Sequence, residues 1–294
     1  MITAALLHSV SYAGLWGQAS LSVEDFVDKA AALGYDGVLL MAKRPHVSVL
    51  DYGPKERARL RARIEKAGLR SVAIAGYTNF TADLEHGDIP TREMQVRHVV
   101  ELAELARDLG GDKVRVFTGY ENPAAPYAAQ MKIVVDSLRE CARRAAEFGV
   151  TIGVQNHHDL ACGFEAMRDL IQAVCEPNCR AMFDAWAPAL HGADILAAAR
   201  ALGSLTVHTT IADYQLRPRY AYEPAIVNYR ALNPAVQAVR MGEGFIDYRG
   251  FLAALSEGGF RGSVAYEMCS PLREGGSIET LDSYARTFLE FLKA

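Results

Sequence analysis

Four apolar segments in the second half of the sequence each contain a polar side chain that could bind a metal ion. The segments are TIGVQNHHD, RAMFDAW, LTVHTT and GSVAYEMC, and the side chains are those of Gln155, Asp184, His208 and Glu267. A single polar group at the end of a buried segment most often makes an ordinary hydrogen bond. Four on successive segments favour a shared site. Their oxygen and nitrogen atoms suit Mn²⁺, with Mg²⁺, Co²⁺ or Zn²⁺ possible, and a polar network without metal is the competing interpretation.

The elements that would position these side chains follow a repeated pattern along the chain. A helix-like run, a glycine and a β-branched apolar run recur, as in AALGYDGVLL and AEFGVTIGV. Glycine adopts the left-handed conformation that ends a helix before the next strand. Pro177 marks one further junction, and six junctions carry a glycine: Gly34, Gly68, Gly110, Gly149, Gly203 and Gly259. With an opening strand at TAALLHSV, the pattern predicts eight strands that alternate with helices.

Eight such units predict a single (β/α)8 TIM barrel over residues 1–294. Each unit takes about 37 residues, which is typical of this architecture. The strands are near-continuous apolar runs, as expected when both faces of a parallel sheet are covered. A doubly wound open sheet is the alternative, but no GxGxxG motif follows the first strand. Because barrel chemistry lies at the carboxyl ends of strands, we expect the metal site at the ends of the fifth to eighth strands.

Composition excludes several classes of partner. The 294 residues carry a formal net charge of −4, which disfavours binding to a phosphate backbone. Five cysteines without CxxC spacing predict reduced thiols rather than disulfides. The opening MITAALLHSV has no basic residue before its short apolar run, which is typical of neither a secretory leader nor a membrane span. We therefore expect a cytoplasmic protein that binds neither nucleic acid nor membrane.

The motifs VQNHHD, MFDAW, VHTT, MGEGFIDY and AYE resemble those of the xylose-isomerase-like barrel superfamily, in particular its branch of sugar phosphate isomerases and epimerases. The resemblance covers essentially the whole chain. It implies one divalent metal, Mn²⁺ before others, bound by Gln155, Asp184, His208 and Glu267. The fifth-strand ligand in that group is most often glutamate. Gln155 is therefore a departure that removes one negative charge and one group able to take a proton.

The same resemblance implies an isomerase or epimerase that removes a proton next to a sugar carbonyl through an enediolate. Glu267 is the expected base and His157 the expected second proton-transfer group, with His158 as the alternative to His157. A metal-dependent lyase or dehydratase acting on a keto sugar or an inosose, including elimination from C-glycosides, is the first alternative. Elimination tolerates Gln155 because it needs no second carboxylate. A non-catalytic sugar-binding or assembly subunit is the second alternative.

Further residues are expected to contact the carbohydrate substrate. Aromatic side chains can pack on a sugar ring, and a long loop after the seventh strand, at about residues 211–246, is rich in Arg and Tyr. Long loops at this face commonly act as lids or as subunit contacts, so we expect a lid, a homo-oligomer contact or a second subunit at the barrel mouth. The expected substrate contacts are His8, Trp16, Trp186, Asp213, Arg217 and Glu243.

Overall fold

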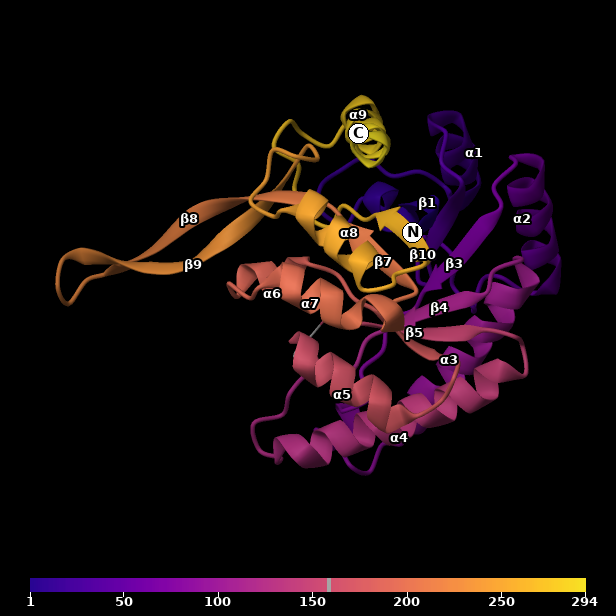
Figure 1. The fold of residues 1–294 in the computed structure, drawn as a ribbon, viewed down its shortest axis with the longest axis horizontal. Helices are drawn as coiled ribbons and strands as arrows, with labels where there is room; N and C mark the ends of the chain where they lie inside the picture. The colour runs from indigo at the N-terminus through magenta and orange to yellow at the C-terminus, as the bar shows by residue number, and fades with distance from the viewer. Residues whose placement is uncertain (158–159) are drawn as a thin grey trace.

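The computed structural model describes residues 1–157 and 160–294, and its central element is a ring of eight parallel strands (Figure 1). Most of their side chains are buried, because the strands are covered by helices outside and by one another inside. The strands are β1 (Ile2–His8), β2 (Gly37–Met41), β3 (Ser71–Ala75), β4 (Lys113–Val116), β5 (Thr151–Gln155), β6 (Cys179–Met182), β7 (His208–Ile211) and β10 (Gly262–Tyr266).

The strand order confirms the predicted barrel. Hydrogen-bonded neighbours run β6-β5-β4-β3-β2-β1-β10-β7, which is the order of a sheet that curls round on itself. A parallel bridge between Ala181 and Thr206 joins the β6 side to the chain just before β7 and nearly closes the ring. The carboxyl ends of all eight strands therefore meet at one mouth.

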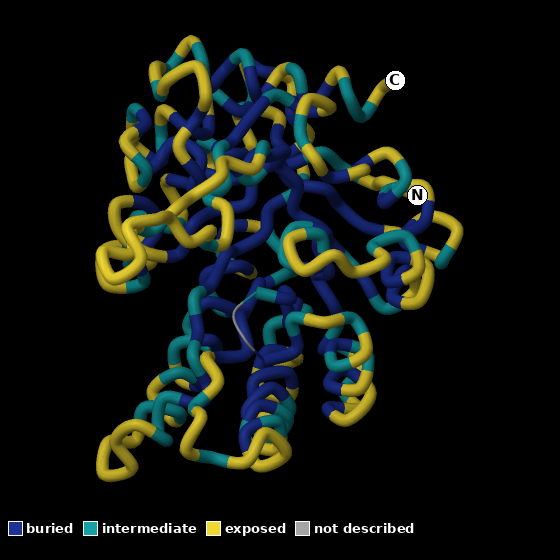
Figure 2. Tube along the Cα trace, turned by 90° about the vertical axis from the view of Figure 1, so that its left-hand side faces the viewer, coloured by how far each residue is buried: buried dark blue, intermediate teal, exposed yellow. Residues whose placement is uncertain are grey.

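The helices form the outer layer, and Figure 2 shows buried strands inside and exposed residues outside. The longer helices bury apolar side chains against the sheet and leave charged residues on the outside. The C-cap of the first helix, Gly34, has φ 89°, as its place before a strand predicted. The helices are α1 (Val23–Leu33), α2 (Pro54–Lys66), α3 (Thr91–Asp108), α4 (Tyr127–Ala146), α5 (Phe164–Val174), α6 (Trp186–Leu190), α7 (Ile195–Leu202), α8 (Tyr248–Glu257) and α9 (Ile278–Lys293).

The segment after β7 corrects one expectation. It was expected to be irregular, but β8 (Asp213–Glu223) and β9 (Asn228–Val239) pair as an antiparallel hairpin. Pro218 and Pro234 lie within it, and the pairing shifts between Arg217 and Arg219, which hides the strand pattern in the sequence. The hairpin, here called the arm, projects from the barrel (Figure 1).

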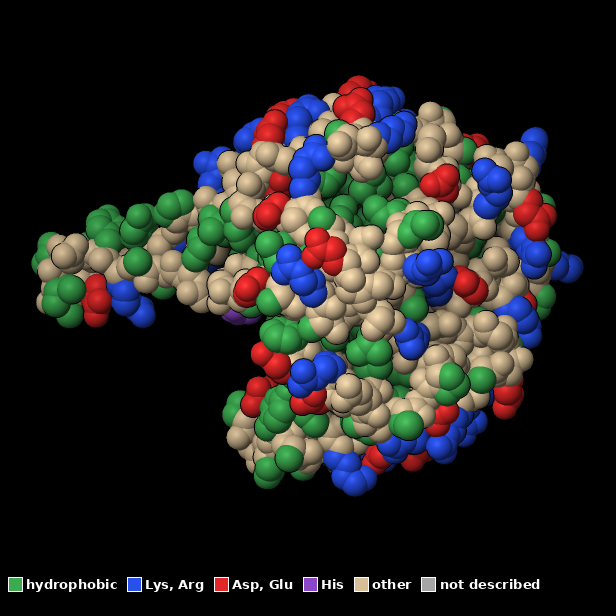
Figure 3. Space-filling view, in the orientation of Figure 1, with side chains coloured by type: hydrophobic (Ala, Val, Ile, Leu, Met, Phe, Trp, Pro, Cys, Tyr) green, Lys and Arg blue, Asp and Glu red, His purple; other side chains and the backbone are tan. Residues whose placement is uncertain are grey.

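Large apolar side chains are exposed along this arm, and Figure 3 shows several green patches on it, separated by tan atoms. They are Leu216, Tyr220, Tyr222, Ile226, Val227 and Tyr229. Exposed apolar surface of this kind is typical of a contact with another molecule or segment. The role of the arm as a lid or a subunit contact stays a prediction.

One further expectation concerns membranes. In the part of the chain that the structure describes, no helix combines the length and the apolar character that crossing a bilayer requires.

Candidate functional site

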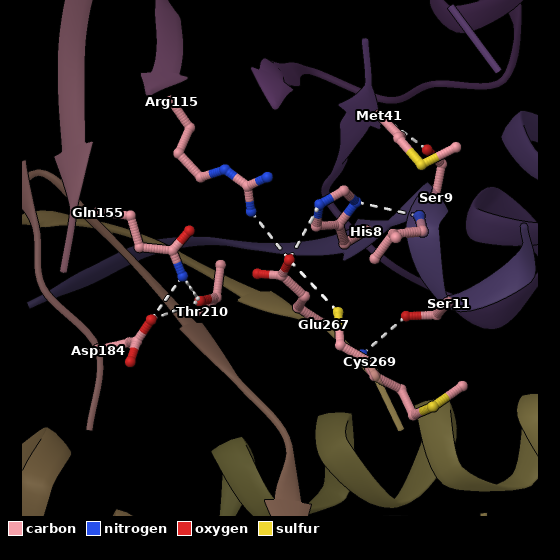
Figure 4. A network of polar contacts seen from close by, with 12 residues as sticks. His8, Ser9, Ser11, Met41, Arg115, Gln155, Asp184, Thr210, Glu267 and Cys269 are labelled. Carbon is pink, nitrogen blue, oxygen red and sulfur yellow. Dashed lines mark hydrogen bonds and ion pairs between the residues drawn. The ribbon is translucent and has the colours of Figure 1, made fainter. Parts of the chain in front are cut away.

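One polar cluster joins the ends of β5, β6 and β7. Gln155 is the last residue of β5, and its Nε2 donates to Asp184 Oδ2 at 2.5 Å and to Thr210 Oγ1 at 3.0 Å (Figure 4). Asp184 lies two residues beyond β6, where its Oδ1 accepts the backbone N–H of Trp186 at 3.1 Å. Asn156 fixes the backbone there, because its side chain bonds both the N–H and the carbonyl of Asp184. The predicted proximity of Gln155 and Asp184 is thus observed.

A second cluster surrounds Glu267, which directly follows β10. Arg115 on β4 donates from Nη1 to Glu267 Oε1 at 2.9 Å, and His8 at the end of β1 places Nε2 3.3 Å from the same oxygen (Figure 4). Cys269 Sγ lies 3.6 Å from it as well. Arg115 is 1% exposed and His8 is 0% exposed, so the ion pair is shielded from water. Glu267 is therefore held by a buried cation from the far side of the barrel.

The two carboxylates differ in their readiness to take a proton. Burial raises the pKa of Asp184 to about 7, and this rise exceeds the lowering effect of the hydrogen bond from Gln155. Burial would also raise the pKa of Glu267, but Arg115 and His8 beside it hold that pKa well below its ordinary value. Two carboxyl groups whose pKa values are shifted in opposite directions are typical of acid–base sites, where one group titrates near neutrality and the other stays ionised.

A cavity at the barrel mouth gives access to both clusters. Its larger part has a volume of about 550 Å³, within the range of small-molecule sites. This part is bordered by Trp16, Lys43, Tyr77, Arg115, Phe117, Tyr120 and Glu267, among others. A smaller adjoining part is bordered by Gln155, Asp184, Thr210, Tyr214, Tyr248 and Glu267, among others. Because the two parts share His157, Trp186, Glu267 and Cys269, one ligand can contact both.

Three of the predicted pocket residues lie at this cavity. Trp16 borders the larger part, and Trp186 borders both parts. His157 also borders both, with its ring centroid 4.7 Å from that of Phe117 and 5.8 Å from that of Trp186. His158 lies outside the described residues. The two tryptophans and the imidazole therefore border the same cavity.

Three other predicted contacts have structural roles instead, outside the described lining of the cavity. Asp213 Oδ2 accepts the backbone N–H groups of Gly242 and Gly244, both at 2.9 Å, and so ties the base of the arm. Arg217 lies on the arm and bonds a neighbouring glutamine there. Glu243 forms an ion pair on the surface. His8, also predicted as a sugar contact, instead faces Glu267 from inside the barrel.

His208 requires a correction. We expected it at the carboxyl end of its strand, but it is the first residue of β7, and the strand continues for three more residues. Its Nδ1 lies 2.7 Å from Ser263 Oγ, near the amino end of β10, and burial lowers the pKa of this histidine to about 3. Thr210, two residues further along β7, is the residue that reaches Gln155 and Asp184.

The residues at the mouth do not fit the predicted divalent metal. Gln155 directs its amide nitrogen, not its oxygen, at Asp184, and the Arg115 guanidinium already neutralises Glu267. His208 is not brought to the cluster. Within residues 1–157 and 160–294, no group of three or more His, Cys, Asp or Glu side chains is arranged to bind a metal ion. The Mn²⁺ cofactor stays a prediction that this arrangement does not support.

Sequence reasoning missed Arg115 and Thr210. The signal for Arg115 is present in KVRVF, where a charged residue interrupts an otherwise apolar strand and must find a buried partner. Nothing in the sequence alone identifies that partner as Glu267, 152 residues further along.

Together the fold and these clusters define a (β/α)8 barrel with a polar site at the carboxyl ends of its strands. The chain belongs to the xylose isomerase-like TIM barrel family, whose model matches residues 27–293. No curated protein matches it.

Solved structures of similar fold come from several enzymes. An L-ribulose 3-epimerase is 19% identical with a TM-score of 0.74, covering 100% of this chain and 94% of that one. A 3-keto-D-glucoside 4-epimerase from E. coli is 15% identical with a TM-score of 0.72, covering 99% of each chain. A probable 3-DHS dehydratase from Bacillus anthracis is 16% identical with a TM-score of 0.71, covering 100% of this chain and 99% of that one.

Proposed function

We propose that this protein is a sugar isomerase or epimerase that moves a proton on the carbon next to a carbonyl group. One observation carries the proposal: a buried carboxyl, Asp184, whose pKa is raised to about 7, borders a pocket of about 40 Å³ that adjoins an aromatic-lined cavity of about 550 Å³. A general base works best when its pKa is near the working pH. Similar folds among sugar epimerases support the same class.

The base in this proposal is Asp184 rather than Glu267, which the sequence had favoured. Arg115 and His8 keep Glu267 ionised and lower its pKa, so it attracts a proton weakly. Asp184 takes the proton from carbon on one oxygen while its other oxygen keeps the bond from the Trp186 backbone. Gln155 and Thr210 both donate to Oδ2, the oxygen that takes the proton, and so fix its position.

A single base, Asp184, limits which reactions the site can catalyse. If Asp184 exchanges its proton with solvent and delivers it to the neighbouring carbon, while the hydroxyl proton moves between the two oxygens of the enediolate, a ketose and an aldose interconvert on a single face. Inversion at one carbon needs a second group on the opposite face, and His157 is the candidate because it borders both parts of the cavity. Aldose–ketose isomerisation therefore requires fewer groups than epimerisation at this site.

A lyase is the second candidate, because only one of the two carboxyl groups, Asp184, is suited to act as a base. Removal of one proton by Asp184, with a leaving group departing from the next carbon, needs one base only. The similar fold of a probable dehydratase is compatible with this chemistry.

The test is to incubate the full-length protein in D₂O with free ketoses, 3-keto sugars and an inosose. Proton NMR and ultraviolet absorbance then identify the products. We expect an isomer that carries deuterium next to the carbonyl, formed by the wild type and by the control Asp169→Asn on the exposed face of α5, but not by Asp184→Asn. New conjugated absorbance would instead assign the lyase, and the absence of any product would contradict both enzymatic proposals.

A further inference from the structure

Arg115 is held at the centre of the barrel as a permanent cation. Its side chain is 1% exposed, and its guanidinium carbon lies 4.6 Å from the ring centroid of Phe117 and 5.1 Å from that of Tyr77. Only Nη1 is used in the pair with Glu267. Burial of a charged guanidinium is unfavourable by itself. The two aromatic rings and the carboxylate of Glu267 offset this cost and stabilise the charge inside the barrel.

The remaining donors of Arg115 have no hydrogen-bond partner within the described part of the protein. Nε and Nη2 are both buried and unpaired, and these two groups form the edge of a guanidinium that binds two oxygens at once. The same holds for three atoms of residues that border the cavity: Glu267 Oε2, Gln155 Oε1 and Trp186 Nε1. Unsatisfied buried polar atoms are rare, and these five belong to four residues that border one cavity, although the five atoms themselves lie beneath its surface.

We propose that Arg115 takes the place of a divalent cation in this barrel and supplies the positive charge that binds the carbonyl oxygen of the substrate. The inference rests on the proposed function for the identity of that ligand. As the proton leaves carbon, negative charge develops on the carbonyl oxygen, and a fixed guanidinium stabilises it without needing to reorganise.

Charge balance explains why a metal ion and Arg115 exclude each other. The two carboxylates near the mouth, Asp184 and Glu267, carry at most two negative charges, and the guanidinium offsets one of them. A divalent ion beside Glu267 would lie close to the guanidinium, and repulsion between like charges is strong in a buried site. Gln155 and Thr210 add oxygen atoms but no charge. The site therefore has too little negative charge for both cations.

The first experiment measures metal binding and does not depend on knowing the substrate. The purified wild-type protein is analysed for metal content and then titrated with Mn²⁺, with the signal of free Mn²⁺ followed by electron paramagnetic resonance. We expect no stoichiometric divalent metal and no loss of the free Mn²⁺ signal at equimolar protein. The double variant R115M/Q155E, which removes the cation and adds a carboxylate, is expected to bind Mn²⁺ at least about tenfold more tightly than the wild type.

One divalent ion per wild-type chain, or tight Mn²⁺ binding by the wild type, would overturn the inference whatever the reaction proves to be. The wild-type result alone decides this, so it does not matter whether the double variant folds. A metal-free protein that converts none of the sugars tested would contradict the proposed function instead, and would leave the exclusion of metal by Arg115 standing.

The second experiment tests whether Arg115 acts on the reacting oxygen. Arg115→Lys keeps the charge but loses the two-pronged edge, and Arg168→Lys on the exposed side of α5 is the matched control. We expect Arg115→Lys to lower kcat by about 10²-fold or more with a smaller change in KM, since the interaction strengthens as the negative charge forms. A wild-type kcat in Arg115→Lys, with the native circular dichroism spectrum retained, would refute the role.

Discussion

Arg115 and Glu267 meet across the full width of the barrel. Arg115 lies on β4 and Glu267 follows β10, four places apart in the ring of eight strands, yet Nη1 and Oε1 are 2.9 Å apart. A buried ion pair that spans the barrel interior ties opposite walls together at the level of the mouth. The same pair fixes the protonation state of Glu267 and leaves Asp184 as the carboxyl that titrates near neutrality.

Breaking this pair from one side is expected to destabilise the protein strongly. Glu267→Gln or Arg115→Met alone should each lower the free energy of unfolding by about 3–5 kcal/mol, because each leaves a buried charge without its partner. The double variant R115M/E267Q should lose clearly less free energy of unfolding than the sum of the two single losses. Urea denaturation of all four proteins measures the coupling.

The exposed pair Arg168–Asp169 provides the control for this cycle, because surface pairs contribute about 0–1 kcal/mol. Strictly additive losses at Arg115 and Glu267 would mean that the two side chains do not interact in solution.

The pH dependence of activity should report Asp184. Because burial raises the pKa of Asp184 to about 7, the base is ionised above that pH and protonated below it. We expect kcat/KM to rise with pH and to level off above a midpoint near 7. A midpoint near 4, the ordinary range of a carboxyl group, would show that Asp184 is not the titrating base.

Acid stability should depend on His208. Burial lowers the pKa of this histidine from 6.5 to about 3, so between these values the unfolded chain binds a proton that the folded protein does not. The free energy of unfolding should therefore fall as pH drops from 6.5 towards 3. His208→Gln should show a shallower decline over this window, measured by denaturation at several pH values.

His191→Gln, at an exposed position, is the control for His208 and should keep the wild-type slope. An unchanged slope in His208→Gln as well would mean that the buried imidazole does not contribute to the acid sensitivity.

The base of the arm depends on Asp213. Its carboxylate accepts the backbone N–H groups of Tyr214, Gly242 and Gly244, and hydrogen bonds to a charged group each contribute about 1.5–3 kcal/mol. Asp213→Ala should raise the rate of limited proteolysis within β8 and β9 by about tenfold or more, while Glu223→Ala at the far end of the arm should not. Equal protection in both variants would show that Asp213 does not anchor the arm.

The sequence was informative where a signal is local. Glycine-ended helices and apolar runs predicted the eight barrel strands, and Gln155, Asp184 and Glu267 lie at or just beyond the carboxyl ends of β5, β6 and β10. His208 was misplaced because LTVHTT does not show where the strand begins, and a few residues decide which end of the barrel a side chain occupies. Arg115 was missed because its partner is distant in sequence and becomes a neighbour only when the barrel closes.

The most direct test of the account is the rate at which solvent deuterium enters the carbon next to the carbonyl of a converted sugar, measured by NMR in the presence of a strong metal chelator. We predict that the wild-type rate is unchanged by the chelator and that Asp184→Asn lowers it by about 10²–10⁴-fold, the usual contribution of a general base. Exchange that stops on chelation, or that proceeds equally well in Asp184→Asn, would contradict an acid–base site that works with a guanidinium in place of a metal.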